Sequence, residues 1–150
     1  MEALKKIENT ILIEAFPDVV WKFLTEPGLM KYWMGEKEME IEVSTNWKIG
    51  NPISISGFHH IKFENRGTVL DFEPQKKLSY THLSSLSLLS DVKAHYSIIT
   101  FLLKKINDKT EITLQLENFP TEAIYKHLNF YWRGTLMQLK SIIESKRNSI

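Results

Sequence analysis

The stretch that decides the fold is TEAIYKHLNFYWRGTLMQLKSIIES, residues 121–145. Its first residue, Thr121, follows Phe119-Pro120 and suits the position that caps a helix. The spacing of one helix face then recurs at Ile124, Leu128, Tyr131, Trp132, Thr135, Leu139, Ile142 and Ile143. At 1.5 Å per residue a helix of this length spans about 40 Å, so it must pack against something broad.

The segments before this helix show the alternation of strands. The clearest case is residues 38–43, where Met39, Ile41 and Val43 alternate with glutamates, which predicts one buried and one wet face. Strand patterns also cover residues 7–15, 53–57, 62–73, 78–83, 95–104 and 110–117. Their spacing predicts six or seven strands in an antiparallel meander.

Two short helices are expected after the first strand. Pro17 and Asp18 suit the first turn of one helix, which must end before Pro27-Gly28. Apolar residues within 29–34 can form one face of a second short helix. The pattern therefore predicts an α+β chain that ends in its longest helix.

Composition limits the classes of function. A chain of 150 residues, 43% of them hydrophobic, fits one domain over residues 1–150. The 19 Lys and Arg nearly balance the 18 Asp and Glu, which argues against a nucleic-acid partner. The absence of cysteine excludes disulfides and thiolate chemistry and fits a reducing cytosol. No stretch reaches ~18 consecutive apolar residues and no leader pattern opens the chain, so we expect a cytoplasmic protein without a membrane span.

Several motifs follow one another in a recognisable order along nearly the whole chain. They are FPDVVWKFLT at 16–25, Met30, Trp33, WKIG at 47–50, GTVLDFEP at 67–74, LSYT at 78–81, TEITL at 110–114, and Trp132, Leu136 and Leu139-Lys140. Together they resemble the activator of heat-shock-protein-90 ATPase homologue family, within the START-like (SRPBCC, birch-pollen-allergen-like) superfamily.

The resemblance implies a helix-grip fold, in which a curved antiparallel sheet of six or seven strands wraps round a long C-terminal helix. It also implies a cavity between sheet and helix, which the superfamily uses for lipids, sterols, polyketides and other apolar molecules. The family often has a small residue immediately before the helix tryptophan. Tyr131 occupies that position here, so its bulk is expected to narrow or reshape the cavity.

Aromatic side chains are the richest candidates for a ligand site, because rings stack on flat ligands and tyrosine adds a directed hydrogen bond. Core packing is the commoner role of any single one. The residues expected to line the cavity are Trp33, Phe58, Tyr80, Tyr96, Ile98, His127, Phe130, Tyr131 and Trp132. Tyr80, Tyr96 or His127 would orient the ligand. Gly134, inside the helix, is expected to serve close packing or a slight bend.

Other site chemistries lack their usual patterns. His59 and His60 are adjacent on a predicted strand and point to opposite faces, and no HxH or HExxH pair exists, so we expect no metal site. His82, His95 and His127 can approach one another, but no acidic partner is identifiable by spacing. GxSxG elbows and glycine-rich phosphate loops are absent, so we expect no cofactor and no catalysis.

The leading interpretation is a non-catalytic protein that binds a hydrophobic or amphipathic small molecule, in a pocket of ~300 Å³ or more. One alternative is an enzyme of the cyclase or hydratase type with a cavity His or Tyr as acid or base, which would need a paired base and orienter. The other is a protein-interaction module, chaperone-related or a homodimer, which would need an exposed apolar patch or a large symmetric interface.

Overall fold

Seven antiparallel strands form one sheet in the computed structural model, which describes residues 5–148. The strand order is β1-β7-β6-β5-β4-β3-β2. The strands are β1 (Lys6–Ile13), β2 (Glu42–Thr45), β3 (Pro52–His59), β4 (Ile61–Glu73), β5 (Lys77–Ser84), β6 (Ser97–Ile106) and β7 (Lys109–Glu117). The helices are α1 (Pro17–Thr25), α2 (Pro27–Trp33) and α3 (Glu122–Asn148), with 3-10 turns η2 (Lys37–Met39), η3 (Ser85–Ser87) and η4 (Lys93–His95).

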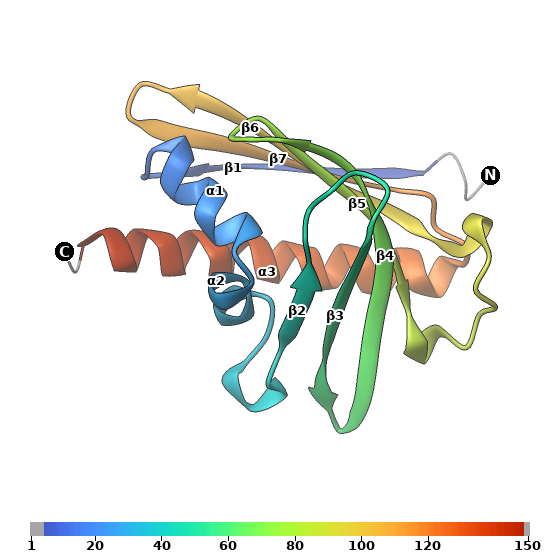
Figure 1. Ribbon diagram of the computed structural model, residues 1–150. Coiled ribbons are helices and arrows are strands. Elements are labelled where there is room, and N and C mark those ends of the chain that lie inside the picture. The colour runs from blue at the N-terminus through green and yellow to red at the C-terminus, as the bar shows by residue number, and fades with distance from the viewer. Residues whose placement is uncertain (1–4, 149–150) are drawn as a thin grey trace.

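Helix α3 lies across one face of the sheet, with α1 and α2 beside its C-terminal half (Figure 1). This arrangement confirms the predicted helix-grip fold. Thr121 caps the helix as expected, because its side-chain oxygen accepts a hydrogen bond from the Ile124 amide at 3.1 Å. The 27 residues of α3 give a length of about 40 Å, which matches the breadth that the sequence required.

The core is the layer between α3 and the sheet. On β6, Ile99, Phe101 and Leu103 are buried, and the Phe101 ring meets the Trp132 ring of α3 edge to face at 5.6 Å. Alternation along each strand then assigns its other side chains to the face away from α3, called the outer face below. Leu136, Leu139 and Ile143 of α3 are buried as well. Full burial of each such side chain contributes about 1.5–3 kcal/mol.

Two tryptophan indoles fix the short helices. Trp33 of α2 donates its indole N–H to the Phe23 carbonyl of α1 at 2.8 Å, and its ring lies 6.2 Å from that of Trp132. Trp47 donates to the Thr25 carbonyl at 2.6 Å. Buried indoles find such acceptors because an unpaired N–H is costly away from water. The helix pair is thereby held against both α3 and the sheet.

The sheet bends where β4 changes register between Val69 and Asp71. Nearby, Gly67 passes so close to β5 that a Cβ there would lie 1.7 Å from the Thr81 carbonyl oxygen. The Thr68 amide donates to the Thr81 hydroxyl at 2.8 Å, which keeps the two strands together at this point. Irregularities of this kind increase the curvature of a strand, so they contribute to the bend of the sheet around α3.

The prediction of a strand over residues 38–43 is wrong at its start. Lys37–Met39 form η2, Glu40 has a left-handed φ of 49°, and β2 begins only at Glu42. Met39 packs against β3 from this turn. Its backbone passes so close to Gly57 that a Cβ there would lie 2.9 Å from the Met39 carbonyl oxygen. The alternation of residues 38–43 therefore arises partly from a turn that packs on β3.

Candidate functional site

A hollow of about 590 Å³ runs along helix α3. Its lining consists of His127, Phe130, Tyr131, Arg133, Gly134, Thr135 and Gln138. At helical spacing, His127, Tyr131, Gly134 and Gln138 share one face, while Phe130 and Arg133 lie on one flank. The hollow is open to solvent, since Phe130 is 82% exposed.

Gly134 makes room for the hollow. A Cβ at this position would meet no atom within 4 Å, so the missing side chain leaves open space on the helix surface. This corrects the expectation that Gly134 serves close packing. One helical turn before and after it, by contrast, the lining carries the larger side chains of Phe130, Tyr131 and Gln138.

Two hydrogen bonds tie the lining to the end of α2. Tyr131 donates its hydroxyl hydrogen to the Met34 carbonyl, and the Gln138 amide donates to the Tyr32 carbonyl at 3.4 Å. Burial raises the pKa of Tyr131 to about 12. The phenol therefore stays protonated near neutral pH and keeps its role as donor.

Strand β5 presents Tyr80 and His82 on the face toward α3, where Tyr80 lies near Tyr131 and His82 lies near His127. Burial, together with the nearby His127, lowers the pKa of His82 to about 4. Burial also raises the pKa of Tyr80, with Tyr131 adding to the effect. Both groups are thus uncharged near pH 7. Among the described residues, none forms a hydrogen bond with the His82 imidazole, the Tyr80 hydroxyl or the His127 imidazole.

The predicted lining residues divide into three groups. His127, Phe130 and Tyr131 line the open hollow along α3. Trp33, Tyr80 and Trp132 are at most 2% exposed and belong to the packed core. The third group consists of Phe58, Tyr96 and Ile98, which lie on the outer face.

Strand register places Phe58 and Ile98 on the outer face, and a hydrogen bond holds Tyr96 on the same side. Ile98 alternates with Ile99, which faces the helix, so Ile98 points to the outer face. Phe58 alternates in the same way with buried Ile55 and half-buried Gly57, and its ring is exposed. Tyr96 donates its hydroxyl hydrogen to Asp91 at 2.6 Å. Their assignment to the cavity is therefore wrong.

The hollow along α3 differs from the enclosed cavity expected between sheet and helix. Leu136, Leu139 and Ile143 fill the space under the C-terminal half of α3 against the sheet. The hollow along the helix is instead open, and its volume exceeds the ~300 Å³ of a small-molecule site. Arg133, Gly134, Thr135 and Gln138 were missed as lining residues. Helical spacing from His127 and Tyr131 could have indicated Gly134 and Gln138.

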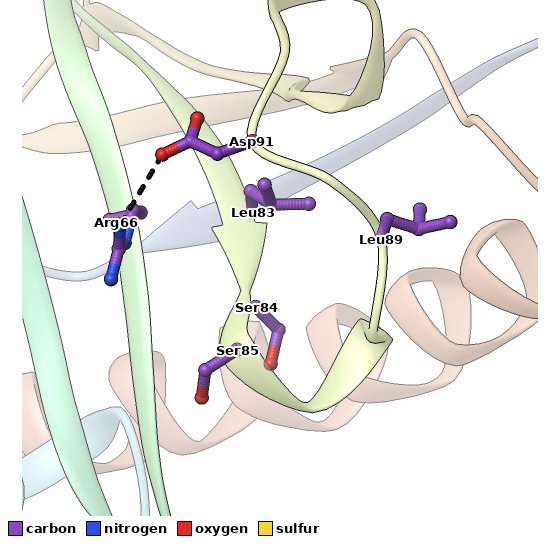
Figure 2. A pocket seen from close by; sticks show the side chains of 6 residues that line it. All are labelled: Arg66, Leu83, Ser84, Ser85, Leu89 and Asp91. Atoms are coloured by element: carbon purple, nitrogen blue, oxygen red, sulfur yellow. Dashed lines mark hydrogen bonds and ion pairs between the residues drawn. The ribbon is translucent and has the colours of Figure 1, made fainter.

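A second, smaller hollow of about 170 Å³ lies on the outer face, between β4, β5 and the loop after β5 (Figure 2). There Arg66 pairs with Asp91 at 3.3 Å and with Glu64 at 3.0 Å. The hydrogen bond from Tyr96 lowers the pKa of Asp91, and Arg66 adds to the effect. Because these charges already satisfy one another, this hollow is a weaker candidate for a ligand site.

Two wider features bear on the class of function. Among the described residues, no three His, Asp or Glu side chains are grouped so that they could hold a metal ion. Within the same range, no helix has the length and apolar character that a membrane crossing requires.

Comparison with known proteins gives a consistent answer. Residues 14–144 match the family model described as Activator of Hsp90 ATPase homolog 1-like protein. A solution structure from Cytophaga hutchinsonii is similar over 99% of both chains, with 29% identity and a TM-score of 0.79. The Aha1 dimer from Colwellia psychrerythraea has 21% identity and a TM-score of 0.74, over 94% of this chain and 97% of that one.

A protein from Chromobacterium violaceum is similar as well, with 19% identity and a TM-score of 0.78, over 93% of this chain and 97% of that one. No functionally curated protein matches the sequence. The family model covers most of the chain, and the fold agrees with it throughout. The chain therefore belongs to the Activator of Hsp90 ATPase homolog 1-like family.

Proposed function

We propose that this protein binds a hydrophobic or amphipathic small molecule in the hollow along α3, and that it does so without catalysis. The observation that carries the proposal is the space above Gly134, bordered by Phe130 and Tyr131. Small-molecule sites are typically hollows of about 300–1,000 Å³ with aromatic walls and a few polar groups. The hollow has that size and that composition.

Affinity would come chiefly from apolar surface removed from water. Phe130 is largely exposed to solvent, although its ring is large and apolar. Covering such a ring gains about 25 cal/mol for each Å² of apolar surface. Burial of Phe130 by a ligand would thus correct a feature that costs free energy in the unliganded protein.

Orientation would come from polar groups with which no described residue forms a hydrogen bond. His127 lines the hollow, and the His82 imidazole of β5 lies near His127. The neutral His82 imidazole carries one donor and one acceptor. A ligand hydroxyl or carbonyl that reaches either imidazole would form a hydrogen bond that no described residue supplies.

The surroundings of the imidazoles support binding rather than catalysis. A histidine that acts as general base is usually held by a hydrogen bond from its second nitrogen to an orienting group, often a carboxylate. Within the described part of the chain, neither His82 nor His127 forms an ion pair with an Asp or Glu. A pKa near 4 also makes His82 a weak base.

The proposal is tested with 1-octanol as probe, by following the amide signals of α3 in NMR titrations. The decisive variant is Gly134→Leu, which fills the hollow without meeting other atoms at its Cβ. Gly28→Leu is the matched control, since Gly28 also borders open space but does not line the hollow. We expect Gly134→Leu to weaken binding at least about tenfold, equivalent to 1.4 kcal/mol, and Gly28→Leu to leave it unchanged.

Absence of binding to the unmodified protein would overturn the proposal, and so would equal binding by the Gly134→Leu variant. Thermal unfolding of both variants checks that they are folded. Native mass spectrometry of the freshly purified protein adds an independent measurement, because a bound molecule would appear as added mass that Gly134→Leu removes.

Two further proposals concern the setting of this activity. The Colwellia relative is described as a dimer, and a homodimer is proposed here on that likeness. Analytical ultracentrifugation tests it directly. A cytoplasmic location is proposed from the absence of cysteine, and fractionation of cells that produce the protein tests it.

A further inference from the structure

Among the described residues, Arg133 is the one charged side chain in the lining of the hollow, apart from the titratable His127. It is exposed, and among the described residues no carboxylate forms an ion pair with it. The other arginine whose charge borders a hollow, Arg66, is already paired with Glu64 and Asp91. The guanidinium of Arg133 is therefore a cation without an ionic partner among residues 5–148, at a largely apolar site.

The sign and size of this charge narrow the ligand. In the described part of the chain no acidic side chain lines the hollow, so an ammonium head group would meet only repulsion from Arg133. A phosphate monoester carries between one and two negative charges at neutral pH, more than one guanidinium neutralises. A carboxylate carries one charge, and its two oxygens match the planar fork of an arginine.

The place of Arg133 on the helix also favours a charged head group beside an apolar body. Arg133 and Phe130 lie on the same flank of α3, one helical turn apart. A molecule whose apolar part covers Phe130 and the open surface at Gly134 would bring an attached head group toward Arg133. The arrangement thus provides an apolar surface with a guanidinium at its edge.

We infer that the ligand of the hollow is an amphipathic carboxylic acid, with its carboxylate paired to Arg133 and its apolar body over Gly134 and Phe130. This inference rests on the proposed function, since it assigns the head group of a ligand for the same hollow. It adds a specificity-determining residue that the family membership does not provide.

The test compares octanoate with 1-octanol, which share a chain length and differ in the charged head. Arg133→Gln removes the cation, and Lys126→Gln is the matched control, because Lys126 is an exposed cation on α3 outside the lining. We expect Arg133→Gln to weaken octanoate binding about fivefold and to leave 1-octanol within twofold, as for a solvent-exposed ion pair. Lys126→Gln should change neither.

Arg133→Lys provides a further check on geometry. The lysine keeps the positive charge but lacks the planar pair of N–H donors of a guanidinium. Arg133→Lys should therefore weaken octanoate binding less than Arg133→Gln does. High salt should weaken octanoate binding to the unmodified protein and leave 1-octanol binding unaffected by charge screening.

The outcomes separate the two proposals. If 1-octanol binds in a manner that depends on Gly134, but octanoate binding ignores Arg133→Gln or responds equally to Lys126→Gln, this inference is overturned and the proposed function stands. If neither probe binds the unmodified protein, the proposed function itself fails. An equal loss of both probes in Arg133→Gln would also overturn the carboxylate assignment.

Discussion

The hydroxyl of Tyr131 donates a hydrogen bond to the main-chain oxygen of Met34, which joins α3 to the end of α2 across 97 positions of sequence. Tyr131 also stacks its ring near that of His127, at 6.4 Å, and meets Trp132 edge to face at 5.2 Å. One side chain therefore contributes to the wall of the hollow and to the packing of the helix pair. Its two functions can be separated by removing the hydroxyl alone.

Tyr131→Phe should destabilise the fold by about 1 kcal/mol, because the ring remains while the Met34 carbonyl loses its partner. Urea unfolding measures the difference, which corresponds to a fall in Tm of about 2–4 °C for a chain of this size. Tyr125→Phe is the control on the same helix. Its hydroxyl forms no hydrogen bond with a described residue, so little change is expected. Equal effects of the two changes would contradict the role of the Met34 contact.

Two glycines should respond in opposite directions to the same substitution. Gly134→Ala adds a Cβ that meets nothing and raises helix propensity, so it should stabilise the protein by up to about 1 kcal/mol. Gly67→Ala places a Cβ 1.7 Å from a backbone oxygen of β5, which forces the strands apart. It should cost about 3 kcal/mol or more. Chemical denaturation of both variants checks the contrast, and a destabilised Gly134→Ala would mean that the helix surface there is not open.

Much of this architecture can be predicted from the sequence. The 3.6-residue period of α3 extends over the whole helix, because every turn contributes a side chain such as Leu128 or Leu139 to one buried face. A helix can be predicted from so long a periodic pattern even where single residues depart from it. The short alternating pattern around Met39 is ambiguous, because a few alternating residues fit a packed turn as well as a strand.

The site is harder to predict, because it depends on side-chain direction. A shift of one residue moves a strand side chain to the other face, so the assignments of Phe58 and Ile98 depended on a register that sequence alone does not fix. The hollow itself exists where α3 is not covered by another element. Gly134 marks that place, but a glycine within a helix has the same appearance in a sequence whether it borders packed or open space.

His82 makes the stability of the fold depend on pH. Its pKa is about 4 in the folded protein and 6.5 ordinarily, so the unfolded chain binds the proton more readily between these values. Stability is therefore fully present above pH 6.5 and falls as the pH drops toward 4. Because the side chain is only partly shielded from water, we expect a loss of about 2 kcal/mol rather than the full value of such a shift.

The measurement compares unfolding free energies at pH 7.5 and pH 4.5. His82→Gln should lose about 2 kcal/mol less than the unmodified protein over this interval, because it has no proton to gain. His59→Gln is the control, since His59 is exposed at the end of β3. Carboxylates that titrate in the same interval affect all three proteins alike. An NMR titration in which the His82 ring protonates near pH 6.5 would contradict the prediction.

The last prediction concerns Asn9, whose side-chain nitrogen is buried and has no hydrogen-bond partner among the described residues. Asn9 pairs with Leu114 in the register of β1 and β7, and Leu114 is buried on the face toward α3. The amide therefore points into an apolar layer, where an unsatisfied donor costs about 1–3 kcal/mol. Asn9→Val removes the donor and adds a side chain that strands favour.

We expect Asn9→Val to stabilise the protein by about 1 kcal/mol, measured as a higher midpoint of urea unfolding at an unchanged slope. Asn9→Asp is the informative counterpart. It replaces the amide with a carboxylate that must be buried or protonated, so it should destabilise the fold at pH 7. Stabilisation by both substitutions would show that Asn9 reaches water, whereas destabilisation by valine would mean that the amide makes a contact that the fold requires.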